Sequence, residues 1–189
     1  MKKFLTLRNI ALFCGALLLL VAFFISFAAS IKIIDGNDYT KFYNVIWGCN
    51  KMDTSGHITV LDADEKMGVA VLPFIGLWLL LVGALGAILV GLLVKKPFAK
   101  WVVVVCAVLA LAGAIMQFFI FDQFVRAFIH KMAEDLHVTD KEQIKHAIEQ
   151  YKEMYGAYKR NEVVSILMGV FGILGGLAIG ASQFLPEKK

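Results

Sequence analysis

The chain has 189 residues, of which 59% are hydrophobic and 18% are charged, and its mean hydropathy is +0.73. Soluble domains carry about 25% charged residues, so this composition excludes an ordinary soluble globular protein. The net charge of +4 comes from basic residues that gather beside apolar stretches, which is typical of membrane proteins and requires no nucleic-acid partner.

Four stretches of the chain contain no Asp, Glu, Lys or Arg, and each is long enough to cross a hydrocarbon core, which takes about 20 residues. They predict an all-α membrane protein, a four-transmembrane-helix bundle, that forms a single domain over residues 1–189. The predicted spans cover about residues 9–31, 68–94, 101–122 and 162–185. The two larger connections are residues 32–67 and 123–161.

The distribution of basic residues predicts the orientation of the spans. Lys and Arg cluster before the first span, in the connection 95–100 and at the C-terminus, whereas the two larger connections are neutral or acidic. The positive-inside rule therefore places both termini in the cytoplasm and both larger connections outside a cell membrane. A cleavable secretion signal is the alternative for the first span, but its apolar run exceeds the usual length of about 7–15 residues.

The first larger connection has the alternation of a β-hairpin. Two runs of β-prone residues, 42–47 and 58–61, would point alternate side chains to opposite faces: Tyr43, Val45 and Trp47 on one face of the first run, and Ile58 and Val60 on one face of the second. The segment 52–56 between them has turn composition. Residues 31–34 could add a third strand. The candidate partner-binding residues are the apolar ones on this hairpin: Tyr43, Val45, Trp47, Ile58 and Val60. The alternative is that the hairpin only packs on the rest of the outer structure, because an isolated hairpin is marginally stable in water.

Small residues mark the expected contacts between the spans, since close backbone approach favours helix association in lipid. Gly76, Gly83 and Gly91 share a face of the second span at 100° per residue. On the fourth span the shared face is made of Gly169, Gly172, Gly176 and Gly180. We expect these faces to pack within one molecule, with self-association through the fourth span as the alternative.

The second larger connection is predicted to be a helical hairpin that extends the third and fourth spans. An apolar stripe continues past the third span through Phe121, Val125, Phe128, Met132 and Leu136, as if one helix ran over 101–137. A capping-box pattern, Thr139-x-x-Glu142, then predicts the start of a new helix. The residues at coiled-coil spacing on that helix are Ile144, Ile148, Tyr151, Tyr155 and Tyr158.

Candidate ligands for a metal are few. His130, Glu134 and His137 would lie within about 60° on one face of a helix, a spacing that can chelate a divalent ion. A solvated polar face is the favoured interpretation, and we expect no metal and no other cofactor.

Motifs for nucleophilic, phosphate-binding or redox chemistry do not occur in the sequence, so we expect a protein that is not an enzyme.

Cysteine usage predicts no intramolecular disulfide, because Cys14 and Cys106 fall in spans and Cys49 in the outer connection. Cys49 is interpreted as a small buried hydrophobe, with a free thiol or an intermolecular crosslink as alternatives.

The segment Trp47-Gly48-Cys49, in a β-prone first outer loop of a four-span chain, resembles the claudins and related peripheral-myelin-protein-like tetraspans. The resemblance covers the topology of most of the chain and three residues of motif. Claudins carry a longer motif with a Leu-Trp pair and a second cysteine. Here positions 57–59 hold His57, Ile58 and Thr59, so the claudin disulfide cannot form.

The functional hypothesis is a non-catalytic integral membrane scaffold or accessory subunit. It would bind a membrane or extracytoplasmic protein, or a second copy of itself, through its outer connections. The alternative is a channel or transporter subunit, whose pore would form between copies because the spans lack the ionisable residues that mark ion pathways. An enzyme would have to draw its catalytic groups from His130, Glu134 and His137.

Overall fold

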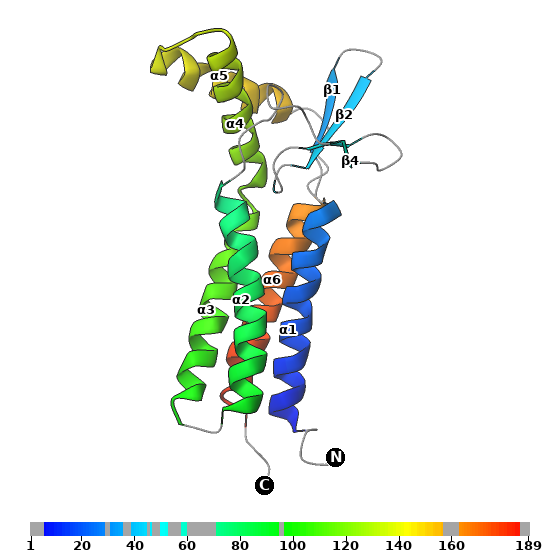
Figure 1. The fold of residues 1–189 in the computed structure, drawn as a ribbon, viewed down its shortest axis with the longest axis vertical. Coiled ribbons are helices and arrows are strands. Elements are labelled where there is room, and N and C mark those ends of the chain that lie inside the picture. Colours follow the sequence, from blue (N-terminus) through cyan, green and yellow to red (C-terminus); the bar gives the residue numbers. More distant parts are fainter. Residues whose placement is uncertain are drawn as a thin grey trace. The chain divides into compact units, whose positions relative to one another are not determined.

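Four long apolar helices lie side by side in the computed structural model of the chain (Figure 1). They are α1 (Leu7–Ile25), α2 (Val71–Leu93), α3 (Ala99–Gln117) and α6 (Val163–Ser182). Each is long and apolar enough to cross a membrane, which confirms the prediction of a multi-pass membrane protein at this level. The structure describes residues 6–28, 31–35, 39–44, 46, 50–52, 58–59, 71–94, 97–156 and 163–185.

Two of the predicted spans are too long. The first was expected to reach residue 31, but α1 ends at Ile25, a 3₁₀ turn η1 (Ser26–Ala28) follows, and a strand begins at Ile31. Ser26 ends the helix, and its Oγ donates a hydrogen bond to the Phe23 carbonyl at 2.6 Å. The third span ends at Gln117 instead of continuing towards residue 137, because Phe118 and Phe119 form a turn before the next helix.

The glycine face of α2 packs mainly on α3. A β-carbon at Gly76 would lie 2.7 Å from the Gly113 carbonyl oxygen, and one at Gly83 would lie 2.9 Å from the Cys106 carbonyl oxygen. The backbones of these two helices are therefore in direct contact. Gly91, the third glycine of this face, meets the Leu12 side chain of α1 instead.

The predicted face of α6 packs along α3 in the antiparallel sense. Gly169 meets the ring of Phe118, Gly172 meets Ala114, Gly176 meets Leu111, and Gly180 meets Ala107. The sequence position rises on α6 as it falls on α3, as expected for neighbouring antiparallel helices. This glycine face therefore packs on α3 within the molecule.

Two glycines that the sequence analysis did not single out make the closest crossings. Gly175 of α6 faces Gly15 of α1, and a β-carbon on either would lie 2.7 Å from the carbonyl oxygen of the other. A β-carbon at Gly113 would lie 2.5 Å from the Gly76 carbonyl oxygen. These positions have room only for hydrogen, so the bundle is held by backbone-to-backbone packing.

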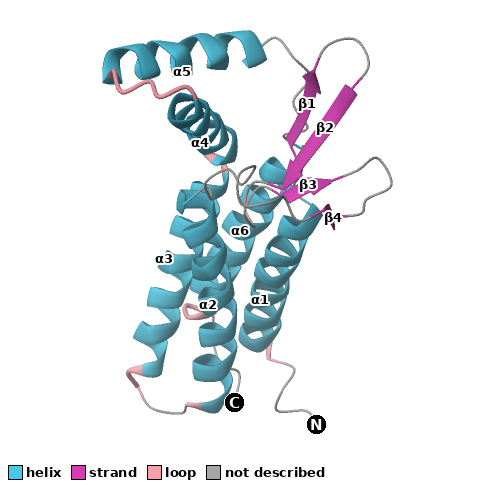
Figure 2. Ribbon diagram, turned by 45° about the horizontal axis from the view of Figure 1, so that its top comes forward, coloured by secondary structure: helices cyan, strands magenta, loops and turns pink. Residues whose placement is uncertain are grey.

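The first larger connection contains a four-stranded antiparallel sheet rather than the predicted hairpin. Its strands are β1 (Ile31–Asp35), β2 (Tyr39–Asn44), β3 (Asn50–Met52) and β4 (Ile58–Thr59), in the order β1-β2-β3-β4. β2 pairs with β1 and β3, so it does not pair with β4 as the predicted hairpin requires. Figure 2 shows the order in magenta. A short extra strand at residues 50–52, between the two predicted strands, separates these predicted partners.

The second larger connection contains the expected helical hairpin, formed by α4 (Ile120–Asp135) and α5 (Lys141–Gly156). The face of α4 that is buried differs from the predicted stripe: Val125 is buried, but Met132 and Leu136 are exposed. The buried residues of the hairpin are Ile120, Phe124, Val125, Ile129, Ala133 and Ile148. α4 has apolar residues on more than one face, so their spacing alone could not identify the packed one.

The turn between these helices corrects the predicted cap. Asp140, not Thr139, is the N-cap of α5: its Oδ1 accepts a hydrogen bond from the Glu142 backbone N–H at 2.9 Å. A carboxylate suits this position because it also faces the positive end of the helix dipole. α4 ends in a Schellman motif, in which His137 adopts a left-handed φ of 55° and the Val138 N–H donates to the Ala133 carbonyl at 2.8 Å.

By its internal contacts the chain forms two compact units. One unit holds most of the four apolar helices, and the other holds the sheet with α4 and α5. We call the first the bundle unit and the second, after the side of the membrane on which the sequence predicts it to lie, the outer unit.

Candidate functional site

The predicted partner-binding residues do not form one hairpin. Tyr43 lies on β2, where it pairs with Ile31 of β1 and Lys51 of β3. Ile58 lies on β4 and pairs with Met52 of β3. The two predicted groups are therefore on strands that β3 separates. The remaining predicted residues, Val45, Trp47 and Val60, lie outside the described part of the chain, as does Cys49.

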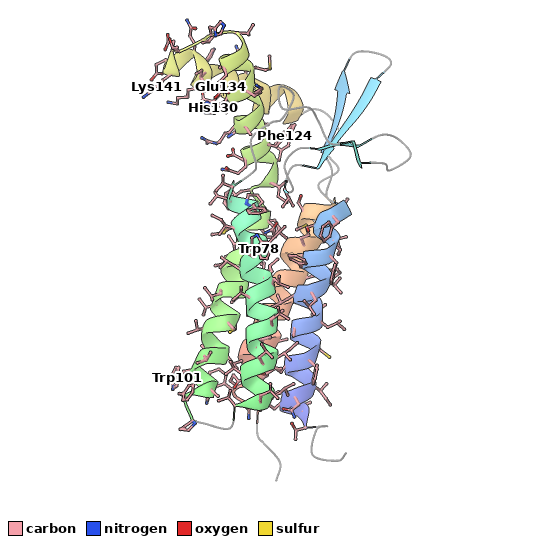
Figure 3. All side chains as sticks on the ribbon, in the orientation of Figure 1. Trp78, Trp101, Phe124, His130, Glu134 and Lys141 are labelled. Atoms are coloured by element: carbon pink, nitrogen blue, oxygen red, sulfur yellow. The ribbon has the colours of Figure 1, made fainter. Side chains whose placement is uncertain are left out.

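The His130, Glu134 and His137 trio loses its helical alignment. His130 and Glu134 are exposed side chains of α4 (Figure 3), but α4 ends at Asp135 and His137 is in the left-handed turn beyond it. The three side chains therefore do not share one face of a helix. Among the described residues, no group of three His, Cys, Asp or Glu side chains is arranged to hold a metal ion.

A charged cluster that the sequence analysis missed joins the two helices of the outer hairpin. Asp122 of α4 accepts a hydrogen bond from Arg126 Nε at 2.8 Å, one turn further along the same helix. Its other carboxylate oxygen accepts from Lys152 Nζ of α5. The Asp122–Arg126 spacing of four residues is a visible signal of a helical ion pair. Lys152 is thirty positions away in sequence, and no local pattern connects it to Asp122.

Two opposing effects set the protonation of Asp122. Partial burial of the carboxyl raises its pKa, but the hydrogen bonds and positive charges of Lys152 and Arg126 outweigh that effect. The pKa of Asp122 therefore lies below its ordinary value of 3.8, and the carboxylate is ionised at neutral pH. The ionised form can hold the start of α4 to the last turns of α5.

Acid should loosen the hairpin through this carboxylate. Because the folded pKa of Asp122 is lower than the unfolded one, its stabilising contribution is complete above the unfolded value of 3.8 and is lost as pH falls through the folded pKa. We expect amide exchange in α4 and α5 to accelerate over that acidic window in the wild type. Asp122→Asn should remove this component of the pH dependence, and an unchanged acid transition in the variant would contradict the assignment.

The described polar side chains that are buried in the bundle unit are few. Among the described residues, the buried polar side chains are Ser26, Gln117, Ser182 and Gln183, and none is charged. Ser182 Oγ donates back to the Ile179 carbonyl at 2.6 Å, and Gln117 Nε2 donates to the Gly113 carbonyl at 3.1 Å. These hydrogen bonds stay within one helix and pair the Ser182 hydroxyl and the Gln117 side-chain N–H, which would otherwise be costly in a membrane.

The cysteines of the bundle differ in environment. Cys14 is exposed on α1, on a membrane-spanning helix, whereas Cys106 is buried on α3. The Cys106 sulfur lies 2.7 Å from where Gly86 would carry a β-carbon, so it fills space between α2 and α3. Both are free thiols.

Neither a protein-family model nor a curated protein sequence matches this chain. The architectural resemblance to the claudins therefore stays a prediction.

Proposed function

We propose that the chain is a non-catalytic membrane scaffold or accessory subunit that binds a partner protein through its outer unit. The contrast between the two units carries the proposal. In the bundle unit the helix backbones pack in direct contact, α2 on α3 where Gly76 meets Gly113, and α1 on α6 where Gly15 meets Gly175. Such packing suits an anchor, and it leaves the role of recognition to the folded structure outside the spans.

The outer unit has features that suit a binding module. Its helical hairpin has a buried core around Phe124 and an ionic link between Asp122 and Lys152. It also presents Leu136, which is 69% exposed, and the exposed Met132 one turn earlier. Exposed apolar side chains on a rigid, partly polar element are typical of protein interfaces.

The orientation of the chain belongs to the same proposal. The basic residues before α1, between α2 and α3 and after α6 favour cytoplasmic termini under the positive-inside rule. The outer unit would then face the outside of the cell membrane, where it would meet a membrane protein, an extracytoplasmic protein or a second copy. The claudin-like arrangement of a β-rich first loop is consistent with this proposal.

Trp47→Ala tests the proposal. Buried aromatic anchors dominate interface energies, so we expect this change to weaken partner binding by about 2 kcal/mol or more. The partner is first identified by crosslinking in native membranes and then purified, and its affinity for the full-length protein in detergent is measured by titration. Self-association is measured in parallel from the mass of the purified protein as a function of its concentration.

Trp101→Ala is the matched control, because Trp101 is an exposed tryptophan of the bundle unit (Figure 3). It should leave partner affinity unchanged. If Trp47→Ala lowers the unfolding temperature but binds the partner with normal affinity, Trp47 is a packing residue and the docking proposal is wrong. Ion flux through liposomes that contain only the purified protein would instead support the channel alternative.

A further inference from the structure

The first turns of α1 and α3 meet the turn that follows α6 at one end of the bundle unit. Arg8 Nη2 of α1 donates a hydrogen bond to Gln183 Oε1 at 3.2 Å. Lys100 Nζ of α3 lies 4.9 Å from the centre of the Phe184 ring. Gln183 and Phe184 are consecutive residues, so two cations from separate helices are held on a single turn of the chain.

The turn that holds these cations is itself fixed. Gln183 is only 6% exposed, and its Nε2 donates to Ser182 Oγ at 2.7 Å. Ser182 Oγ in turn donates to the Ile179 carbonyl at 2.6 Å. The amide oxygen that receives Arg8 is therefore oriented by a short relay of buried groups. A cation ordered in advance loses less conformational freedom when it binds an anion.

The sequence adds more positive charge around the same helix ends. The segments 1–8, 95–100 and 183–189 together contain eight Lys and Arg residues and a single acidic residue, Glu187. Phe98 and Trp101 flank Lys100 and are exposed, Trp101 by 71%. Exposed aromatic residues at the end of a membrane span lie at the level of the lipid headgroups. Arg8 and Lys100 are thus placed at the depth of lipid phosphates.

We propose that this end of the bundle unit binds the headgroup phosphate of an anionic phospholipid. Arg8 supplies guanidinium N–H donors, whose planar fork matches phosphate oxygens, and Lys100 supplies a compact charge. The surrounding basic segments attract the anionic lipid. The proposal is independent of partner binding by the outer unit. The competing explanation is that both cations only stabilise the C-terminal end of α6, whose dipole is negative.

The test uses the full-length protein in a neutral detergent. It is titrated with dioleoylphosphatidylglycerol or with dioleoylphosphatidylcholine, and bound lipid is counted by native mass spectrometry. The wild type should prefer the anionic lipid. Each basic residue near a membrane surface contributes about fivefold in affinity, so Arg8→Gln with Lys100→Gln should reduce phosphatidylglycerol binding by about 25-fold. Phosphatidylcholine binding should not change.

The matched control is Lys141→Gln with Lys145→Gln, which removes the same charge from exposed positions of α5. It should leave the preference for phosphatidylglycerol intact. Salt dependence of the wild type, followed by tryptophan fluorescence, gives a second measurement that does not require a variant to fold. Added salt should weaken phosphatidylglycerol binding, because it screens surface charge. Equal affinity for the two lipids in the wild type, or an unchanged preference in the Arg8 and Lys100 variant, would overturn the proposal.

Discussion

Gly113→Ala should lower the free energy of unfolding of the bundle unit by about 3 kcal/mol, at the upper end of the cost of overpacking. The added β-carbon would lie 2.5 Å from the Gly76 carbonyl oxygen and 3.2 Å from the Leu80 backbone nitrogen. Both atoms belong to the backbone of α2, so a side-chain rotation cannot relieve the clash. The helices must separate along their contact, which also loses packing at neighbouring positions. Thermal unfolding of the purified protein in detergent measures the effect.

Gly76→Ala should have a similar effect because it acts on the same crossing, and the two changes combined should cost less than their sum. Gly180→Ala is the control. A β-carbon there would lie 3.6 Å from the Ala107 β-carbon, an ordinary contact. Since alanine favours the helix over glycine, Gly180→Ala should be neutral or stabilising by about 0.5–1 kcal/mol. A Gly113→Ala protein as stable as the wild type would contradict the backbone contact between α2 and α3.

Phe124→Ala should open the helical hairpin of the outer unit. Phe124 is only 2% exposed, and truncating a buried phenylalanine costs about 3–5 kcal/mol. Two helices with one small core have little stability beyond that amount, so α4 and α5 should lose protection against amide exchange. The exchange of α1 and α2 should stay slow, because those helices belong mainly to the other compact unit. Hydrogen exchange with mass spectrometry on the full-length protein separates the two responses.

Leu136→Ala is the control for this change, since that side chain is 69% exposed and its loss leaves no cavity. Exchange in α4 and α5 should stay within the range of the wild type. Under the proposed function, Leu136→Ala should lower partner affinity without changing stability, which makes it a test of binding separate from folding. Slow exchange of the hairpin in Phe124→Ala would show that its core lies elsewhere.

The sequence alone determined which segments are apolar enough to lie in a membrane. A charged side chain is expensive in hydrocarbon, so the four charge-free stretches predicted α1, α2, α3 and α6 without any tertiary information. The glycine spacing on α2 and α6 also predicted that these faces make close contacts. It could not predict which helix fills each face: Gly83 meets α3, whereas Gly91 meets α1. Helix period places residues on a face, but it does not say what lies opposite.

The tertiary structure decided whatever depends on residues that are distant in the chain. Asp122 could be paired with Arg126 from their spacing, but not with Lys152, because the turn after α4 determines how α5 returns. Gly113 and Gly175 gave no signal of their own, since their importance comes from a carbonyl oxygen on another helix. The pattern of the strands predicted β structure at residues 42–47 and 58–61 but missed β3 between them, which pairs with both β2 and β4 and so replaces the predicted pairing of those two strands. The local sequence indicates whether a segment lies in lipid or water and which residues share a face. Which two segments pack together depends on steric fit and hydrogen bonding between parts of the chain that meet only after folding.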